Sequence, residues 1–430
     1  MPSFERYHKL YRMKRTPGLV FIFITLLIDM LGAGLLVPIL PSFISHLMHS
    51  GLDKAARHYG LLMSLYGAMQ FIFAPILGAL SDRYGRRPIL LLSLLFTGVD
   101  YVIMALAPSL VWLYIGRVLS GITGASFTAA NAYVADVSPP EKRAQNFGIF
   151  GAAFGIGFII GPAAGGLLGS VGERLPFWIA AALAFANLLY GWFILPESLK
   201  PENRRRVSWR EANPVGAMFV LLKYPVVWGL TGALATSNLG MQCLNSTWVL
   251  FTTAKFGWDI RANGICMAVF GLIALIYQIG LGRILLPRLG DRRTMLLGNV
   301  VGTLECLGYA LSPRGWMVYP IMLIGGFGFL AGPATQSLLS RQVRENEQGV
   351  LQGALSSLGS LAAILGPFIG SSMFSYFTQP GRDPRAPSAP VFLSAILYVV
   401  ATVLAVRATR SIRNEMPSAA LPAEGVTDTV

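Results

Sequence analysis

The sequence contains many long apolar segments, and they constrain the fold more than any other feature. A helix needs about 20 predominantly apolar residues to cross a bilayer, whereas a stretch of about 10–14 is more typical of a soluble core. A large soluble core therefore does not account for these segments. We count twelve of them, and each predicts one membrane-spanning helix: residues 18–41, 59–80, 88–107, 110–133, 147–169, 176–195, 226–250, 263–285, 294–312, 315–339, 349–374 and 389–407.

The composition agrees with an all-α polytopic membrane protein. Hydrophobic residues make up 54% of the chain and only 13% of residues are charged, against about 25% in a typical soluble protein. The first apolar segment is too long for the core of a signal peptide and no small-residue cleavage site is evident, so we expect the first span to be retained. The three cysteines have no spacing typical of metal ligands, so no metal site is predicted.

The net charge of +14 could indicate a nucleic-acid-binding protein, so the placement of the basic residues matters. An even number of spans puts both termini on one side of the membrane. If that side is the cytoplasm, 25 of the 34 Lys and Arg residues lie in cytoplasmic segments or at the cytoplasmic ends of spans, eight lie in outer loops, and Arg117 lies deeper within a span. The positive-inside rule then predicts that both termini are cytoplasmic, and the basic charge reflects topology.

The chain divides at a polar, basic stretch into two groups of six spans, which resemble each other at an offset of 205 residues. The predicted parts are an N-terminal six-helix bundle (1–195), a cytoplasmic linker (196–225), a C-terminal six-helix bundle (226–408) and a disordered tail (409–430). The matching landmarks are Gly148 with Gly353, Gly161-Pro162 with Gly366-Pro367, and RYGRR (83–87) with RLGDRR (288–293). Two such parallel repeats predict a substrate site near the membrane midplane, between the halves.

Three carboxylates lie inside predicted spans: Asp29, Asp100 and Glu305. Each costs about 2.5–3.5 kcal/mol at a helix centre, so such residues are functional candidates by default, although any one could be a polar residue stabilised by packing. Asp100 and Arg117 share a depth on adjacent antiparallel helices and are expected to pair. Asp29 and Glu305 have no partner evident in the sequence, and no span contains a histidine. We therefore expect these two carboxylates to carry protons.

Charged side chains gather in a tight turn after the second span, in GALSDRYGRRP (78–88). Asp82 and Arg86 in this turn, with Asp136 and Arg143 from the next predicted cytoplasmic loop, are expected to form charge pairs that hold the halves in one state and break as the halves move. The alternative is a basic loop that only sets topology.

The fifth span carries a face of small residues in GIGFIIGPAAGG. Small residues let helix backbones approach closely, and a proline bends a helix. A tightly packed helix of no special function is the general alternative. The residues singled out are Gly157, Gly161, Pro162, Gly165 and Gly166.

These motifs together resemble a known family. GALSDRYGRRP resembles the major facilitator signature between spans 2 and 3, Arg117 in GRVLSGITGA resembles the arginine motif of span 4, and GIGFIIGPAAGG resembles the span 5 motif of drug:proton antiporters. Over nearly its full length the chain is similar to the twelve-span tetracycline efflux proteins. The stretches that carry this similarity are LLIDMLGAGLLVPILP, YGLLMSLYGAMQFIFAPILGALSDRYGRRPILLLSLLFTGVDY, LYIGRVLSGITGA, TWVLFTTAKFGW and QGVLQG.

The resemblance implies a role for several of these residues. Asp29 and Asp100 would handle substrate and protons, Arg117 would be the buried cation, and all three would line the substrate cavity. Gln70 and Gln278 fall on polar cavity positions, where an amide hydrogen-bonds a drug without the cost of a charge. The same resemblance implies gating roles for Asp82, Arg86, Asp136 and Arg143.

Two positions depart from the tetracycline pumps. Span 8 has Ala274 where those pumps have a histidine, and span 9 has Gly302 where they have an essential aspartate. Glu305 lies three residues further along, on roughly the same helix face. The departures weaken the tetracycline assignment more than they weaken proton-coupled export, and we expect Glu305 to be a relocated proton site.

The resemblance favours a proton-coupled antiporter in the cell (inner) membrane, exporting tetracycline or a related amphiphilic drug by alternating access. We expect a monomer that uses the proton gradient and no cofactor; whether the drug travels as a magnesium chelate stays open. The alternatives are a broader multidrug exporter, an exporter of a sugar or other metabolite, and a non-transporting receptor. An enzyme is disfavoured because the sequence has no phosphate loop, metal cluster or nucleophile-base arrangement.

Overall fold

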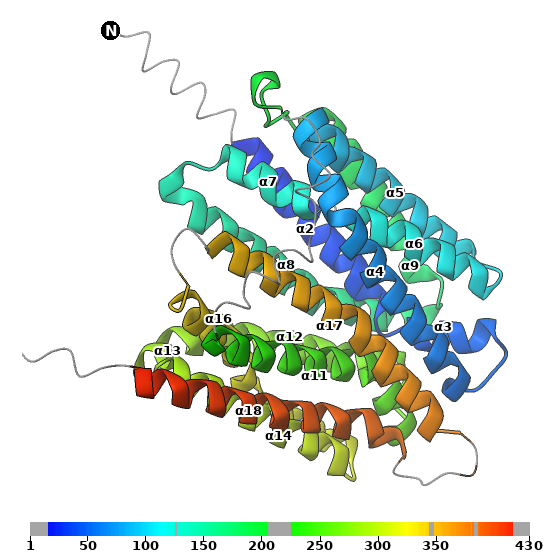
Figure 1. Cartoon of the computed structure of the whole chain (residues 1–430). Coiled ribbons are helices and arrows are strands. Elements are labelled where there is room, and N and C mark those ends of the chain that lie inside the picture. The colour runs from blue at the N-terminus through cyan, green and yellow to red at the C-terminus, as the bar shows by residue number, and fades with distance from the viewer. Residues whose placement is uncertain are drawn as a thin grey trace, which may run out of the picture.

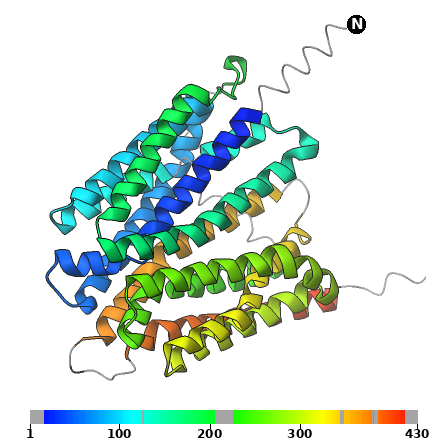
Figure 2. The same ribbon diagram turned by 180° about the vertical axis from the view of Figure 1, so that it is seen from behind.

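The computed structural model describes residues 16–124, 127–204, 225–343, 348–379, 381 and 386–415. Every regular element in these ranges is a helix, and the helices form two bundles that lie side by side (Figures 1 and 2). The start of the first described helix, at Thr16, and the end of the last, at Glu415, lie toward the same end of the molecule (Figures 1 and 2). We call that end proximal and the opposite end distal.

The N-terminal bundle is built on α2, which packs against α8 and α9, while α5 packs against α6 and α9. A short 3-10 helix, η1 (Pro201–Asn203), follows the bundle. The bundle's helices are α2 (Thr16–Leu36), α3 (Leu40–Leu47), α4 (Leu52–Tyr84), α5 (Arg86–Leu106), α6 (Leu110–Gly124), α7 (Phe127–Val137), α8 (Pro140–Val171) and α9 (Leu175–Ile194).

The C-terminal bundle has more broken helices. Two of its spans change helix type part-way, one through the π-helical η3 and one through the 3-10 helix η5. The elements are α11 (Pro225–Phe256), α12 (Ile260–Leu275), η3 (Ile276–Leu281), α13 (Gly282–Leu289), α14 (Asp291–Leu311), η4 (Gly315–Met317), α15 (Val318–Gly325), η5 (Gly326–Leu330), α16 (Ala331–Ser340), α17 (Gln348–Phe377), η7 (Ala386–Ser388) and α18 (Ala389–Glu415).

The offset of 205 residues holds at the level of helix boundaries. α14 begins and ends 205 residues after α5. The residues before the two helices, Gly85 and Gly290, both have positive φ values, of 106° and 76°. α5 and α14 therefore occupy corresponding places in the two halves.

Nine helices in the described ranges are long and apolar enough to cross a membrane, or ten if α2 and α3, which meet at 50°, form one bent span. The other two predicted spans fall on α8 and α11, each 32 residues long. α11 is less apolar because it carries polar residues, among them Asn238 and Gln242, that line a cavity. A total of twelve crossings stays a prediction.

The predicted boundaries of the linker and tail fall partly outside the described ranges. Residues 205–224 and 416–430 are not among the described residues. Helix α18 continues to Glu415, so residues 409–415 are helical where the sequence predicted the start of a disordered tail. The prediction ended the last span where its apolar run stops, but a helix can extend beyond its apolar part.

The two halves meet mainly where α4 packs against α17 and where α8 packs against α12. Ser64 Oγ in α4 donates a hydrogen bond of 2.7 Å to the Ile364 carbonyl in α17. Between α8 and α12 the backbones touch, because both Gly166 and Gly264 lack a side chain at the crossing. The predicted close packing of the small-residue face in the fifth span is therefore part of the contact between the halves.

The close crossing of α8 and α12 predicts that adding one methyl group there lowers the stability of the protein strongly. A Cβ at Gly264 would lie 2.5 Å from the Pro162 carbonyl oxygen and 2.7 Å from Gly166 Cα. Gly264→Ala is expected to destabilise the protein by about 1–3 kcal/mol through overpacking. Gly359→Ala is the matched control, because a Cβ there meets nothing within 4 Å. Thermal unfolding of the purified protein in detergent checks this, and equal unfolding temperatures for the two variants would contradict it.

Candidate substrate and proton site

A cavity of about 470 Å³ lies mainly in the C-terminal half, with Val37, Tyr59, Met63 and Phe158 contributed by the N-terminal half. Its lining combines aromatic and apolar side chains with amides, which is the usual character of a small-molecule site. Glu305 is the one charged residue among the described residues that line it. The amide lining residues are Asn238, Gln242, Asn245, Gln278 and Asn299, and the aromatic ones include Trp248, Phe270, Tyr309, Phe329 and Tyr398.

Glu305 faces this cavity from α14 and accepts one hydrogen bond. Tyr309 Oη, one turn along the helix, donates to Glu305 Oε1 at 2.7 Å. The Tyr309 ring in turn packs edge-on against Trp248, with ring centroids 4.8 Å apart. The carboxylate also lies directly against Gly325 of α15, where any side chain would collide with it. Within the described ranges no ion pair includes Glu305, so it is a free acid in an apolar, aromatic setting.

The position of Glu305 relative to Gly302 agrees with the prediction from helix geometry. Both residues line the cavity, so an acid at either position of α14 would face the same space. Ala274 is half-buried in α12 and is not among the lining residues. Gln278 does line the cavity, and it lies in the π-helical η3. Single π-helical turns are frequent at functional sites.

Asp100 and Arg117 form the predicted ion pair. Arg117 Nη2 lies 3.3 Å from Asp100 Oδ2, and the two side chains are 8% and 0% exposed. Arg117 Nη2 also lies 2.8 Å from Met104 Sδ, and the guanidinium lies 5.8 Å from the centre of the Tyr66 ring. The pair is closed between α5 and α6 of the N-terminal half.

Asp29 belongs to the same N-terminal cluster as this pair. Tyr66 and Tyr101 lie within electrostatic reach of both Asp29 and Asp100. In the described part of the chain, the ion pairs and hydrogen bonds do not include the Asp29 carboxylate.

Four residues predicted to line the substrate cavity are not among the lining residues of the 470 Å³ space: Asp29, Gln70, Asp100 and Arg117. Asp100 and Arg117 bind each other instead, and Gln70 Nε2 donates to the Gly124 carbonyl at 3.3 Å, joining α4 to α6. Of the predicted cavity residues, Gln278 is in the lining, together with the predicted proton carrier Glu305. The structure thus separates an N-terminal charged cluster from a C-terminal cavity.

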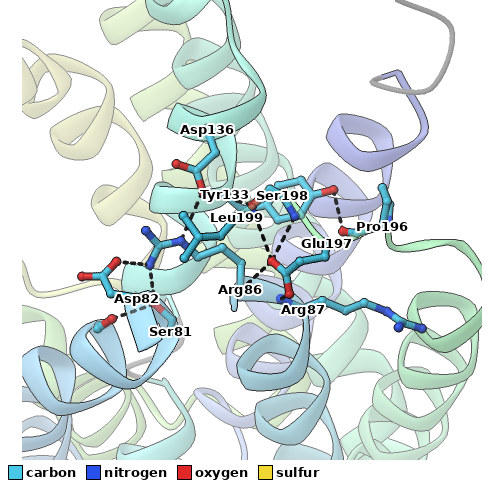
Figure 3. A network of polar contacts seen from close by, with 11 residues as sticks. Ser81, Asp82, Arg86, Arg87, Tyr133, Asp136, Pro196, Glu197, Ser198 and Leu199 are labelled. Atoms are coloured by element: carbon cyan, nitrogen blue, oxygen red, sulfur yellow. Dashed lines mark hydrogen bonds and ion pairs between the residues drawn. The ribbon is translucent and has the colours of Figure 1, made fainter. Parts of the chain in front are cut away.

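The charged turn between α4 and α5 forms a network around Arg86 (Figure 3). Arg86 Nη1 lies 2.5 Å from Asp82 Oδ1, and Arg86 Nε lies 3.2 Å from Asp136 Oδ2. Arg86 Nη1 also donates to Ser81 Oγ at 2.6 Å. The side chain of Arg143 lies outside the described residues. The predicted association of Asp82, Arg86 and Asp136 is confirmed.

Glu197 is part of this network and sequence reasoning missed it. Its carboxylate accepts hydrogen bonds from the backbone N–H groups of Arg86 at 2.9 Å and Arg87 at 3.3 Å (Figure 3). It therefore caps the N-terminus of α5 from the segment that follows α9. Capping signals in a sequence are sought within a few residues of the helix start, and Glu197 is more than a hundred residues away from it.

The partners that the structure gives this network all come from the N-terminal half or from residues 196–199. The sequence predicted that these charge pairs hold the two halves together. In this conformation they stay within one half and do not join the two. A gating role for the network stays a prediction.

The C-terminal half has a corresponding pair with its charges exchanged. Arg341 Nη2 lies 3.0 Å from Asp291 Oδ2. Asp291 follows Arg86 by 205 residues, and Arg341 follows Asp136 by the same offset. The repeat thus retains the ion pair and exchanges the positions of its acid and its base. The 205-residue offset in the sequence would have been enough to predict this pair.

The two glycines before α5 and α14 give a matched prediction. Both need a backbone conformation open only to glycine, so alanine costs about 1–3 kcal/mol at either position. A Cβ at Gly85 would also collide with the Glu197 carboxylate, whereas one at Gly290 meets nothing within 4 Å. Gly85→Ala is therefore expected to destabilise the protein by about 1 kcal/mol more than Gly290→Ala, the usual value of a helix N-cap.

Denaturation of the two variants in detergent measures the difference, and the same comparison in a Glu197→Ala background isolates its cause. There the extra cost of Gly85→Ala should disappear. An extra cost that persists without Glu197 would refute the explanation.

The small residues of the fifth span place α8 between two other helices. Gly157, Gly161 and Gly165 pack against α2, where a Cβ added at Gly161 would lie 2.9 Å from Gly34 Cα, and Gly166 packs against α12. Pro162 lies inside α8. Helix α8 therefore packs through its glycines against α2 of its own half and α12 of the other half. A shift of α8 relative to α2 would change its contact with α12.

Comparison with known proteins gives the family of the chain. The family model of the Major Facilitator Superfamily matches residues 22–367, and a second match covers residues 288–420. The chain belongs to the Major Facilitator Superfamily.

Named relatives lie close within the superfamily. The chain is 41% identical to the tetracycline resistance protein, class C, of Escherichia coli over 84% of this chain and 91% of that protein. It is 30% identical to multidrug resistance protein 2 of Bacillus subtilis over 82% and 88% of the two chains. Among solved structures, an inward-facing, unoccupied bacterial homologue of the human lysosomal transporter Spinster matches with a TM-score of 0.76 at 18% identity, over 95% and 99% of the two chains.

Membership of the superfamily decides the broad class. The protein is a multi-pass membrane protein and a secondary efflux transporter related to the tetracycline resistance proteins, and it is not an enzyme. Its cargo is a small molecule. The cavity around Glu305 is therefore the candidate binding site for that cargo.

Proposed function

We propose that this superfamily member is a proton:drug antiporter that exports tetracycline or a related amphiphilic compound. The observation that carries the proposal is the cavity whose one charged lining residue, among those described, is Glu305. Aromatic and methionine side chains suit the apolar body of such a drug, and the amides supply hydrogen bonds without a charge. The relationship to tetracycline resistance proteins supports the same substrate class.

The coupling follows from competition for one carboxylate. The charged form of Glu305 attracts a cationic group of the substrate, either an amine or a metal chelated by the drug. Protonation removes that attraction, so the drug leaves when a proton takes its place. A proton entering down the gradient supplies about 2.3 kcal/mol per 100 mV of membrane potential.

The proposed topology has twelve spans with both termini in the cytoplasm. The placement of the start of α2 and the end of α18 at the same end of the molecule supports an even number of crossings (Figures 1 and 2). The excess of basic residues in segments at that end supports its assignment to the cytoplasm. The cavity is then exposed to each side in turn as the halves rock.

A broader multidrug exporter is the second candidate. The histidine and aspartate of the tetracycline pumps are replaced here by Ala274 and Gly302, and a relative at 30% identity is a multidrug resistance protein. A sugar or another neutral metabolite is less well supported, because a neutral substrate gains no charge–charge attraction from an unpaired carboxylate in the cavity.

Accumulation measurements test the proposal. The chain is expressed in an efflux-deficient host, and cellular tetracycline is measured with and without an uncoupler, against cells carrying the empty vector. Export predicts low accumulation that the uncoupler restores to the vector level. An identical level in all samples would remove tetracycline as a substrate, and a panel of cationic amphiphilic drugs would then decide between the multidrug reading and no drug export.

A further inference from the structure

The repeat relates two of the three intramembrane carboxylates to each other. Glu305 follows Asp100 by 205 residues, and α14 begins and ends 205 residues after α5. The two acids therefore stand at the same position of corresponding helices. In one half this position holds a closed ion pair, and in the other it holds a free acid at a cavity.

The neighbours of the two acids correspond as well, and they differ in chemistry. Arg117, which pairs with Asp100, corresponds to Met322, and Met322 lines the cavity with Glu305. Ser120 lies beside Asp100 and corresponds to Gly325, which lies directly against Glu305. The same two helix faces meet in both halves, so the residue in the place of the arginine is a methionine.

We infer that Met322 is a positioning residue that keeps Glu305 available for protons and substrate. The role in transport rests on the proposed function. Methionine has the length of the apolar part of an arginine side chain, is unbranched and carries no charge. An arginine at this place would bind the carboxylate permanently, as Arg117 binds Asp100. Met322 leaves Glu305 with the Tyr309 hydrogen bond and an open face toward the cavity.

The groups that face Glu305 do not replace the missing cation. Tyr309 and Cys306 lie on its own helix and Tyr398 approaches from α18. All three are neutral at physiological pH in their usual forms. Within the described ranges, no Lys, Arg or His side chain pairs with Glu305, so a base introduced at residue 322 would meet no competing cation.

Labelling with a hydrophobic carbodiimide tests the inference without any drug. A protonated carboxyl in an apolar site adds to the carbodiimide, and peptide mass spectrometry of the full-length protein in membranes identifies the labelled residue. In the wild type, Glu305 should be labelled and Asp100, its paired counterpart, should not. Met322→Arg should reduce labelling of Glu305 by about tenfold or more, the effect of an arginine beside a carboxylate.

Met322→Gln is the matched control, because glutamine has a similar length without the charge, and it should label as the wild type does. Met322→Lys provides a second cation if the arginine variant does not reach the membrane in folded form. Uncoupler-sensitive export should be lost in the Arg and Lys variants.

Two results would overturn the inference. One is unchanged labelling of Glu305 with a cation at residue 322, and the other is a loss of Glu305 labelling in Met322→Gln as large as in Met322→Arg. The second would show that the methionine acts through packing alone. The labelling pattern does not depend on the cargo. If it holds while the wild type fails to lower drug accumulation, the proposed function fails and the inference about Met322 stands.

Discussion

Glu305→Gln is expected to reduce the rate of uncoupler-sensitive export by about 100-fold or more, the usual contribution of a positioned group that transfers a proton. Glutamine has nearly the same shape, and its carbonyl oxygen can accept the hydrogen bond that Tyr309 donates at 2.7 Å. The cavity and the fold should therefore be preserved while the exchangeable proton is lost. Drug accumulation in cells and drug-induced proton release from membrane vesicles measure the two halves of this expectation.

Glu173→Gln is the matched control, because it makes the same chemical change at a glutamate outside the spans, next to His46. It should leave export unchanged. Glu305→Asp should retain part of the activity, since the acid remains and the side chain is one methylene shorter. Wild-type export by Glu305→Gln would assign the coupling to another carboxylate, with Asp29 the next to test by Asp29→Asn. If both variants exported normally, proton coupling through these two acids would be excluded.

Arg117→Met is expected to destabilise the protein by about 3–5 kcal/mol, the cost of leaving a buried charge without its partner. Asp100 is fully buried in the ion pair, so its carboxylate cannot turn to water when the arginine is removed. Adding Asp100→Asn to the same chain should recover most of this loss, because replacing both members of a buried pair is often close to neutral. Unfolding of the purified variants in detergent measures all three proteins.

Arg314→Met provides the control for the loss of one positive charge, because Arg314 is exposed in the loop before α15. It should change stability by less than about 0.5 kcal/mol, as surface substitutions usually do. If Arg117→Met unfolded together with Arg314→Met, the Asp100–Arg117 contact would contribute little to stability. The different treatment of Asp100 and Glu305 by the two halves would then need another explanation.

The predictions for Glu305→Gln and Arg117→Met follow from one difference between the halves. At corresponding positions, the N-terminal half uses its acid in a closed pair and the C-terminal half presents its acid to the cavity. The expected phenotypes differ accordingly: loss of the arginine should reduce stability, and loss of the glutamate should reduce coupling. The exchanged polarity of Arg86–Asp136 and Asp291–Arg341 shows the same behaviour at the proximal end, where the repeat retains a contact and changes its chemistry.

The sequence alone determined the features that depend on neighbouring residues. Long apolar segments predict spans because every residue of a helix in lipid must be compatible with that solvent. The free-energy cost of placing a charge in lipid can also be judged from the surrounding residues alone, and it singled out Asp29, Asp100 and Glu305. Helix depth was sufficient to pair Asp100 with Arg117, and a shift of three residues was sufficient to place Gly302 and Glu305 on one face.

Only the tertiary structure decided which of these acids meets the cavity. Hydropathy does not report the rotation of a helix about its axis, and that rotation turns Glu305 toward the space lined by α11 and η3 while Asp100 faces Arg117. The cap from Glu197 was invisible for a similar reason, because it joins residues more than a hundred positions apart. The long apolar segments thus establish that the chain crosses the membrane, and contacts between distant helices decide which of its buried acids faces the cavity.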